Sequence, residues 1–268
     1  MSASLLICLG LLAGAGAGFL AGLIGIGGGI VIVPVVYYGL VTSGVSANEA
    51  AHIAVSTSLA AIVPTAIVSS IAHWRAGNTD FAFLRDWGPG IVLGVIVAQL
   101  MAPHLRGSLL TGVFALFCLA VAARFALPGV FKPLLAEPPG GRFTHVAGAG
   151  IGIVSGLAGV GGGILTNVVM TLSGVSMHKS IGRAAAAGLV VSIPATIVAL
   201  GQAVCSDSGA CSISLPMWVC IAPAQATAAW IGAQLAQRIT ADQLSRVFGG
   251  ALAATGAVML QSRVGWPW

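Results

Sequence analysis

The stretch "GFLAGLIGIGGGIVIVP", residues 18–34, places three consecutive glycines in the middle of an otherwise apolar run. Each of Gly27, Gly28 and Gly29 costs a helix about 1 kcal/mol relative to alanine. Glycine also adopts positive φ angles and lets another backbone or a ligand approach closely. The triplet therefore predicts a break between two helical segments rather than one continuous helix.

The same pattern recurs in the second half of the chain as "GIVSGLAGVGGGILTNVV", residues 152–169. Six glycines match at a constant offset, and the match continues with "GVS" at residues 44 and 174, with Pro64 and Pro194, and with "AQL" at residues 98 and 233. The matched pairs are Gly18 and Gly152, Gly22 and Gly156, Gly25 and Gly159, Gly27 and Gly161, Gly28 and Gly162, and Gly29 and Gly163. We interpret the chain as two copies of one transmembrane unit, residues 1–127 and 145–268, joined by a linker at residues 128–144.

The composition places both copies in a membrane. Hydrophobic residues make up 57% of the 268 residues and charged residues only 6%, which is too little polar surface for a soluble globule. Apolar stretches of about 20 residues span a bilayer as helices, and the alternating pattern of a membrane barrel is not found. The predicted segments are 4–24, 30–41, 52–73, 87–103, 108–127, 145–158, 164–173, 180–204, 214–236 and 243–262. The predicted fold class is an all-α polytopic membrane protein.

Each copy holds five of these segments, and an odd number inverts the second copy relative to the first, as in many secondary transporters. No Lys or Arg precedes the first segment, so we expect a retained helix rather than a signal peptide. Cytoplasmic loops collect Lys and Arg, and one orientation puts nine of the eleven basic residues on one side, with Arg106, Arg263 and both termini outside. The nine assigned to the cytoplasm are Arg75, Arg85, Arg124, Lys132, Arg142, Lys179, Arg183, Arg238 and Arg246.

The cysteines point to the same orientation. Cys205 and Cys211 flank "SDSGA" in a loop without Lys or Arg, which the charge rule assigns to the outside, where a disulfide persists. We predict a Cys205–Cys211 disulfide, and the alternative is two unpaired surface thiols. Cys8, Cys118 and Cys220 lie in apolar segments and are interpreted as packing residues. No spacing of cysteines and histidines suggests a metal site.

The runs that follow the two triplets are short. Each has about 12 residues, which is about 17 Å as a helix and about half a bilayer. Each long and short pair therefore predicts a broken or re-entrant helix with its glycine turn at depth. Irregular backbone is tolerated there only where it faces protein or a water-filled cavity.

Such a turn leaves free N–H groups at the start of the following half-helix, and these groups attract anions together with the helix dipole. Two such ends, one from each copy, predict an oxyanion site near the midplane built from Gly27, Gly28, Gly29, Gly161, Gly162 and Gly163. The alternative is tight helix packing, which explains the ladder of Gly10, Gly14, Gly18 and Gly22 and its echo at Gly148, Gly152 and Gly156. Packing does not explain three adjacent glycines. A nucleotide-binding fingerprint lacks the surrounding strand and acidic residue.

The pattern "GxxxGxxGxGGG" near the start of each half, with "TSL" at residues 57–59, resembles the TauE/SafE group of sulfite and organosulfonate exporters, of the 4-toluenesulfonate/sulfite permease type. The resemblance covers nearly the whole chain. It implies a carrier of the bacterial cytoplasmic (inner) membrane that exports a small sulfur oxyanion or sulfonate, with no cofactor. The second copy departs from the pattern, because "AAGL" at residues 186–189 replaces "TSL" and Val168 aligns with Pro34. The two halves are therefore not expected to contribute identical ligands.

Polar residues inside the spans are further candidates, because such groups are costly in a membrane and tend to face cavities. Ser56, Thr57 and Ser58 offer hydroxyls where the matched helix has alanines, and Thr166 and Asn167 lie in the first turn of the second half-helix. We expect them to bind the oxygens of the anion. The alternative is that the hydroxyls bond to their own helix backbone. Gln99, Gln225 and Gln234 are weaker candidates, since a glutamine can equally tie two helices together.

Cationic residues supply two more hypotheses. Arg183, with Lys179, is predicted to draw the anion in from the cytoplasm, and His52, on the outer side, to act in proton coupling or as an exit gate. The alternatives are a topology-setting charge for Arg183 and a structural or capping histidine for His52.

The acidic residues and the net charge bear on other possible functions. An intramembrane enzyme needs an acid–base pair or a metal, yet the acidic residues all fall in predicted loops: Glu49, Asp80, Asp86, Glu137, Asp207 and Asp242. A passive anion channel, or a carrier of another small oxyanion or carboxylate, stays open. The net charge of +5 is interpreted as topological bias rather than as a sign of nucleic-acid binding. The glycine ladders suggest a homodimer.

Overall fold

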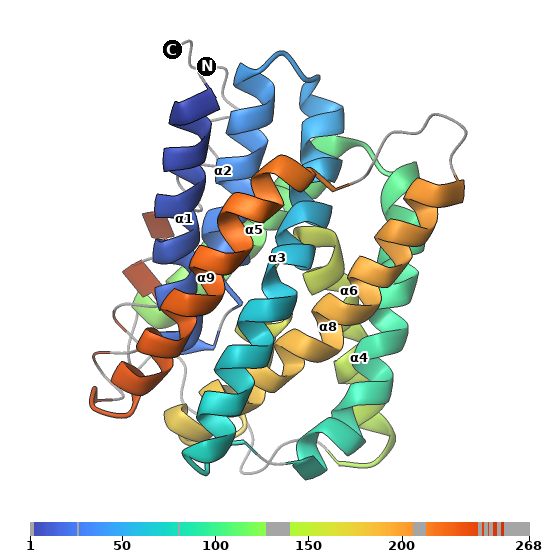
Figure 1. The fold of residues 1–268 in the computed structure, drawn as a ribbon. Coiled ribbons are helices and arrows are strands. Elements are labelled where there is room, and N and C mark those ends of the chain that lie inside the picture. The colour runs from blue at the N-terminus through green and yellow to red at the C-terminus, as the bar shows by residue number, and fades with distance from the viewer. Residues whose placement is uncertain are drawn as a thin grey trace.

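A computed structural model describes residues 3–25, 27–79, 81–126, 140–205 and 213–240, with isolated positions between 243 and 254. Over these ranges the chain is helical and contains no strand, which confirms the predicted all-α class. The helices are α1 (Ala3–Ile24), α2 (Gly29–Thr42), α3 (Ala47–Arg75), α4 (Phe81–Met101) with the short 3-10 helix η1 (Ala102–His104), α5 (Gly107–Ala126), α6 (Arg142–Ala158), α7 (Gly163–Leu172), α8 (Met177–Cys205) and α9 (Leu215–Ala236). They form one upright bundle (Figure 1).

The first nine predicted segments each coincide with one of these helices to within a few residues. Three stretches of described helix, Ala47–Arg75, Ala82–His104 and Met177–Val204, are long and apolar enough to cross a membrane. The predicted segment 243–262 lies almost wholly outside the described residues, as do most of the predicted linker and the predicted disulfide partner Cys211.

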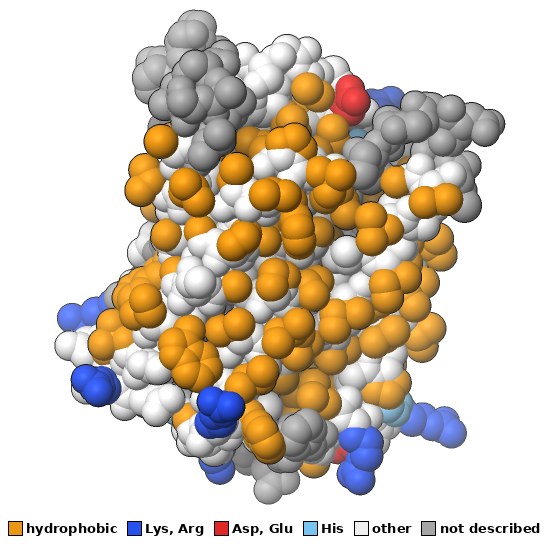
Figure 2. Space-filling model, in the orientation of Figure 1, with side chains coloured by type: hydrophobic (Ala, Val, Ile, Leu, Met, Phe, Trp, Pro, Cys, Tyr) orange, Lys and Arg blue, Asp and Glu red, His pale blue; other side chains and the backbone are white. Residues whose placement is uncertain are grey.

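Large hydrophobic side chains cover the outside of the bundle. Leu12 is 72% exposed, Leu93 64% and Leu116 71%, and further exposed apolar residues lie on α8 and α9. Figure 2 shows a broad band of hydrophobic side chains across the middle of the visible face. Apolar residues on the outside of a helical bundle suit a lipid environment, because the hydrocarbon core offers no hydrogen-bond partners to polar groups.

The bundle is held together by pairs of helices that come from opposite halves of the chain. α1 runs parallel to α9, with Gly14 against Ile221, Gly18 against Gln225 and Gly22 against Ala229. In the same way α6 runs parallel to α4, with Gly148 against Trp87 and Gly152 against Ile91. The glycines of both predicted ladders therefore let backbones approach closely, as small residues do between transmembrane helices.

The long helices α3 and α8 cross at the centre of the bundle in opposite directions, since Ala66 lies beside Gly188 and Asn78 beside Gly182. The first helix of each half thus packs on the fourth helix of the other, and the two third helices pack on one another. These paired contacts are those that an inverted duplication would produce. The inverted duplication itself stays a prediction.

Basic residues gather at one end of the bundle (Figure 2). Arg75 ends α3, Arg142 begins α6, and Arg106 lies at the opposite end, between η1 and α5. The other described basic side chains at the same end as Arg75 and Arg142 are Arg85, Lys179, Arg183 and Arg238. This grouping is the one that the charge rule anticipates, and assignment of that end to the cytoplasm stays a prediction.

The glycine ladder generates a stability prediction. A methyl group at Gly18 would overlap the Gln225 carbonyl oxygen on α9, whereas one at Gly16 on the same helix would meet nothing within 4 Å. We expect Gly18→Ala to lower the free energy of unfolding by about 1–3 kcal/mol, because overpacking must push α1 from α9. Gly16→Ala should leave it unchanged or raise it, because alanine favours helix. Equal thermal midpoints of the two variants in detergent would contradict this packing.

Candidate functional site

Both glycine motifs form turns with the same backbone conformation. In the first turn, Gly25, Gly27 and Gly28 have φ angles of 73°, 74° and 80°. Their counterparts Gly159, Gly161 and Gly162 have φ angles of 72°, 54° and 74°. Left-handed φ angles are strained for any residue with a side chain, so the sequence needs glycine at these positions. The predicted helix breaks are present.

A short helix starts directly after each turn. α2 begins at Gly29 and α7 at Gly163, each preceded by a left-handed glycine, and at neither start does a described side chain cap the helix. The first N–H groups of a helix have no intrahelical partner, and they carry the positive end of the helix dipole. Each turn is thus followed by a helix N-terminus whose free N–H groups and positive dipole end suit an anion.

The two turns touch each other inside the bundle. A methyl group at Gly29 would overlap the carbonyl oxygen of Gly159 and would lie 3.0 Å from the Cα atom of Val160. Ser58 of α3 lies beside both turns and donates a hydrogen bond of 2.8 Å to the Gly159 carbonyl. The starts of α2 and α7 are therefore neighbours, although they belong to different halves of the chain.

In this conformation the turns face protein. The described residues at positions 25–29 and 159–163 are all buried. A methyl group at Gly28 would overlap the Gln225 amide nitrogen, and one at Gly162 would lie 2.5 Å from a methyl of Val191. Of the two environments expected for a turn at depth, the structure shows the packed one. Any ligand of these helix starts would need neighbouring side chains to move.

The predicted hydroxyls of α3 serve different neighbours. Ser58 holds the second glycine turn, whereas the Thr57 hydroxyl accepts a hydrogen bond of 2.9 Å from the backbone N–H of Ser214, just before α9. Ser56 is also buried on this helix. These hydrogen bonds of Ser58 and Thr57 thus join α3 to other segments rather than to its own backbone.

The first turn of α7 contains polar groups without partners. Thr166 and Asn167 are both fully buried. The Asn167 side-chain oxygen accepts a hydrogen bond of 2.7 Å from Ser180 on α8. Within the described structure, the Thr166 hydroxyl and the Asn167 amide nitrogen make no hydrogen bond. Buried polar groups are almost always satisfied, so these two donors keep Thr166 and Asn167 as candidates for ligand binding.

Glutamines tie helices to the glycine motifs. Gln225 of α9 donates a hydrogen bond of 2.8 Å to the Gly27 carbonyl, and Gln99 of α4 donates one of 3.0 Å to the Gly156 carbonyl. Gln234 is exposed. Gln99 and Gln225 thus tie helices together, which was the structural alternative to anion binding. Gln225 also positions the first glycine turn.

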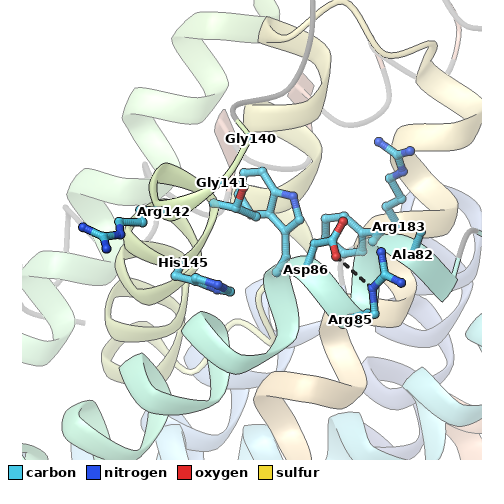
Figure 3. A pocket seen from close by; sticks show the side chains of 11 residues that line it. Ala82, Arg85, Asp86, Gly140, Gly141, Arg142, His145 and Arg183 are labelled. Atoms are coloured by element: carbon cyan, nitrogen blue, oxygen red, sulfur yellow. Dashed lines mark hydrogen bonds and ion pairs between the residues drawn. The ribbon is translucent and has the colours of Figure 1, made fainter.

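Arg183 lines a cavity of about 740 Å³ at the basic end of the bundle. Figure 3 shows Arg183 near the Arg85–Asp86 ion pair, whose atoms lie 3.1 Å apart, and Arg142 with His145 farther across the cavity. The Arg183 guanidinium lies over the ring of Phe83 and 3.4 Å from the sulfur of Met170 on α7. The residue therefore connects a cationic cavity with the helix that carries Thr166 and Asn167.

His52 and Lys179 lie at opposite ends of the bundle. His52 is half-buried near the start of α3, beside the backbone of Leu105, and Lys179 is exposed in the first turn of α8. Neither belongs to the glycine turns. The described residues include no group of histidine, cysteine, aspartate or glutamate that could hold a metal ion.

Sequence reasoning missed two residues next to the turns. Ile62 of α3 packs against both Gly27 and Gly161. His73, also on α3, is 1% exposed, and its Nε2 lies 3.0 Å from the Gly22 carbonyl oxygen, one helical turn before the first glycine turn. When the two halves are aligned through Pro64 and Pro194, Ile62 lies opposite Ser192. This difference between the halves was the one sequence feature that singled out Ile62.

Ser58 offers a test of how the two turns are joined. Ser58→Ala leaves the buried Gly159 carbonyl without its partner, and we expect the free energy of unfolding to fall by about 1–3 kcal/mol. Ser70→Ala on the same helix is the matched control, because the buried Ser70 hydroxyl has no partner among the described residues. Equilibrium unfolding in mixed detergent measures both. A loss for Ser70→Ala as large as that for Ser58→Ala would refute the assignment.

Comparison with known proteins supports a transport function. The model of a family described as "Sulfite exporter TauE/SafE" matches residues 10–259. A Haemophilus influenzae protein described as "Probable membrane transporter protein" is 34% identical over 189 residues, which cover 70% of this chain and 71% of that protein. The Bacillus subtilis protein described as "Probable membrane transporter protein YunE" is 27% identical over 194 residues, 64% of this chain and 68% of that protein. No solved structure matches the chain.

These matches agree with the multi-pass helical architecture and with the apolar outer surface of the bundle. A fold alone does not give a function, but here a family match over nearly the whole chain accompanies it. The protein belongs to the TauE/SafE sulfite exporter family and is a multi-pass cell-membrane transporter rather than an enzyme.

Proposed function

We propose that the protein exports a small sulfur-containing anion, such as sulfite, sulfoacetate or another organosulfonate, across the bacterial cytoplasmic membrane by alternating access. The observation that carries this proposal is the meeting of two uncapped helix starts at left-handed glycine turns inside the bundle. The anion would be held by the N–H groups that follow Gly28 and Gly162, helped by Gly27, Gly29, Gly161 and Gly163.

The electrostatics favour an anion over a cation or a neutral solute. Two helix starts add their positive dipole ends at one place, and a low-dielectric interior strengthens that field. The same interior makes unsatisfied donors expensive. An oxyanion bound there accepts hydrogen bonds from the Thr166 hydroxyl and the Asn167 amide, which lack acceptors in the described structure.

The hydroxyls of α3 complete the proposed site. Ser58 already lies beside Gly29 and the Gly159 carbonyl, and a bound oxyanion would compete for its proton. Ser56 and Thr57 precede it on the same buried stretch. The corresponding positions of α8 are Ala186 and Ala187 with Gly188, so the proposed site draws its side-chain donors from α3 and α7 and remains asymmetric.

Access from the cytoplasm is proposed to run through the cationic cavity. Arg183, Arg85 and Arg142 give this cavity a positive potential against the single described carboxylate of its lining, Asp86. Such a potential concentrates anions before they enter. Arg183 is the arginine of this lining that contacts α7, through Met170. We therefore place Arg183 where the cytoplasmic route meets the proposed site, and Lys179 where the route opens to the cytoplasm.

The packing of the two turns supports the proposal of alternating access. Both are packed in protein here, which corresponds to a closed state in which neither membrane face has an open route to the site. A second cavity, of about 570 Å³, lies at the opposite end and includes Arg106. Opening toward each cavity in turn would carry the anion across. His52, at that outer end, is proposed as the proton-coupling or gate residue.

Flux measurements in proteoliposomes test the proposal. Purified protein should take up radiolabelled sulfite or sulfoacetate with saturation, and an excess of unlabelled anion inside the vesicles should drive counterflow. A passive anion channel would carry flux without counterflow. A carrier of another oxyanion or carboxylate would show saturation and counterflow with acetate or phosphate and none with the sulfur anions.

Thr166 provides a test of ligand binding. Thr166→Val removes a hydroxyl that has no partner in the described part of the protein, so folding should not suffer. We expect the half-saturating anion concentration to rise about tenfold to a hundredfold, because a hydrogen bond to a charged group is worth about 1.5–3 kcal/mol. Thr171→Val is the control, since that hydroxyl bonds to its own helix. Unchanged transport by Thr166→Val would remove Thr166 from the site.

The cationic cavity has its own prediction. Arg183→Gln should raise the half-saturating concentration by about 2–10-fold for entry from the cytoplasmic face and should weaken its dependence on salt, because a steering charge is lost. Arg238→Gln, at an exposed position beyond α9, is the matched control. If both variants keep the wild-type salt dependence, Arg183 serves topology rather than entry.

A further inference from the structure

One apolar side chain occupies the space between the two glycine turns. Ile62 of α3 is fully buried. A methyl group added at Gly27 would lie 3.1 Å from its Cγ2 atom, and one added at Gly161 would lie 3.1 Å from both Cγ2 and Cδ1. One side chain therefore contacts the equivalent glycine of both halves, at the place where the two helix starts meet.

The backbone around Ile62 is suited to local movement. Pro64 lies inside α3 two residues later. Because proline has no N–H, the helix loses the hydrogen bond that this residue would donate to the Ala60 carbonyl. The helical turn that holds Ile62 is thus the one that lacks a backbone bond. Kinks in long helices occur at such positions.

The second half carries a different residue at the aligned position. Ser192 of α8 also precedes a proline, Pro194, by two residues. Ser192 is fully buried, and its hydroxyl has no partner within the described ranges. At this aligned position, the first half therefore carries an apolar side chain and the second half a small polar one.

We propose that Ile62 is the stopper that closes the anion site and sets the size of the anion that the site accepts. In the closed state its side chain fills the space between the two glycine turns and keeps water from their N–H groups. Its side chain contains as many heavy atoms as sulfite, so a small oxyanion takes its place when the α3 turn before Pro64 swings aside. The size selection rests on the proposed function, whereas the exclusion of water from the two turns does not.

Hydrogen exchange tests the closure without any substrate. In Ile62→Ala, backbone amides of the peptides that cover residues 25–31 and 159–165 should exchange about tenfold faster than in the wild type, because water reaches the turns. Ile91→Ala is the matched control, since Ile91 is an equally buried isoleucine on α4 that packs against α6. Ile62→Val should give a smaller effect in the same direction.

The exchange result decides the closure in either direction. Faster exchange at both turns in Ile62→Ala, and not in Ile91→Ala, supports the stopper. Unchanged exchange at the turns in Ile62→Ala, or an equal rise in both variants, overturns it. If Ile62→Ala does not fold, Ile62→Val is compared with Ile91→Val. Faster exchange at both turns in Ile62→Val alone supports the stopper, and unchanged or equally raised exchange overturns it.

Transport tests the size selection. In proteoliposomes, Ile62→Ala should raise the rate for benzenesulfonate relative to sulfite about tenfold, because one pocket group discriminates by roughly that factor. Ile62→Phe should slow both anions. An unchanged ratio in Ile62→Ala, with sulfite carried by the wild type, overturns the size selection. If the wild type carries neither sulfite nor any sulfonate, including sulfoacetate, the proposed function and the size selection both fail, and the exchange result still decides the closure.

Discussion

The structure depends on one constraint: a backbone that leaves the helical path inside a membrane must find its hydrogen bonds and contacts within the protein. Two glycine turns interrupt the helical backbone inside the bundle, and side chains of other helices hydrogen-bond to each turn. Gln225 donates to the Gly27 carbonyl and Ser58 to the Gly159 carbonyl. One carbonyl of each turn thereby accepts a hydrogen bond from a side chain, while the helix starts that follow the turns lack a described side-chain cap. The first N–H groups of α2 and α7 have no intrahelical partner, which is the feature that the proposed anion site requires.

The parallel pairing of α1 with α9 and of α4 with α6 makes these turns possible. Glycines bring the backbones of each pair together, so each pair joins one helix of the first half of the chain to one helix of the second half. α3 and α8 then cross between the pairs and place Ile62, Ser58 and Val191 against the turns. The scaffold is close to symmetric, but its side chains are not.

Much of the fold could be predicted from the sequence, because it follows from apolar length and from glycine. The breaks at Gly27 and Gly161 and the half-length helices α2 and α7 are written locally in the chain. The site could be predicted only in part. Ile62 is an ordinary hydrophobic residue in a hydrophobic helix, and its position between the turns arises from contacts between distant segments. The roles of Ser58 and Thr57 likewise required knowledge of which helix each faces.

The most direct measurement of the central claim is diffraction from crystals soaked with selenite, whose oxygens resemble those of sulfite and whose selenium scatters anomalously. The account predicts an anomalous peak within hydrogen-bonding distance of the backbone N–H groups that follow Gly28 and Gly162, with the Ile62 side chain displaced. A peak confined to the arginine-lined cavity, with both glycine turns still packed around Ile62, would contradict it.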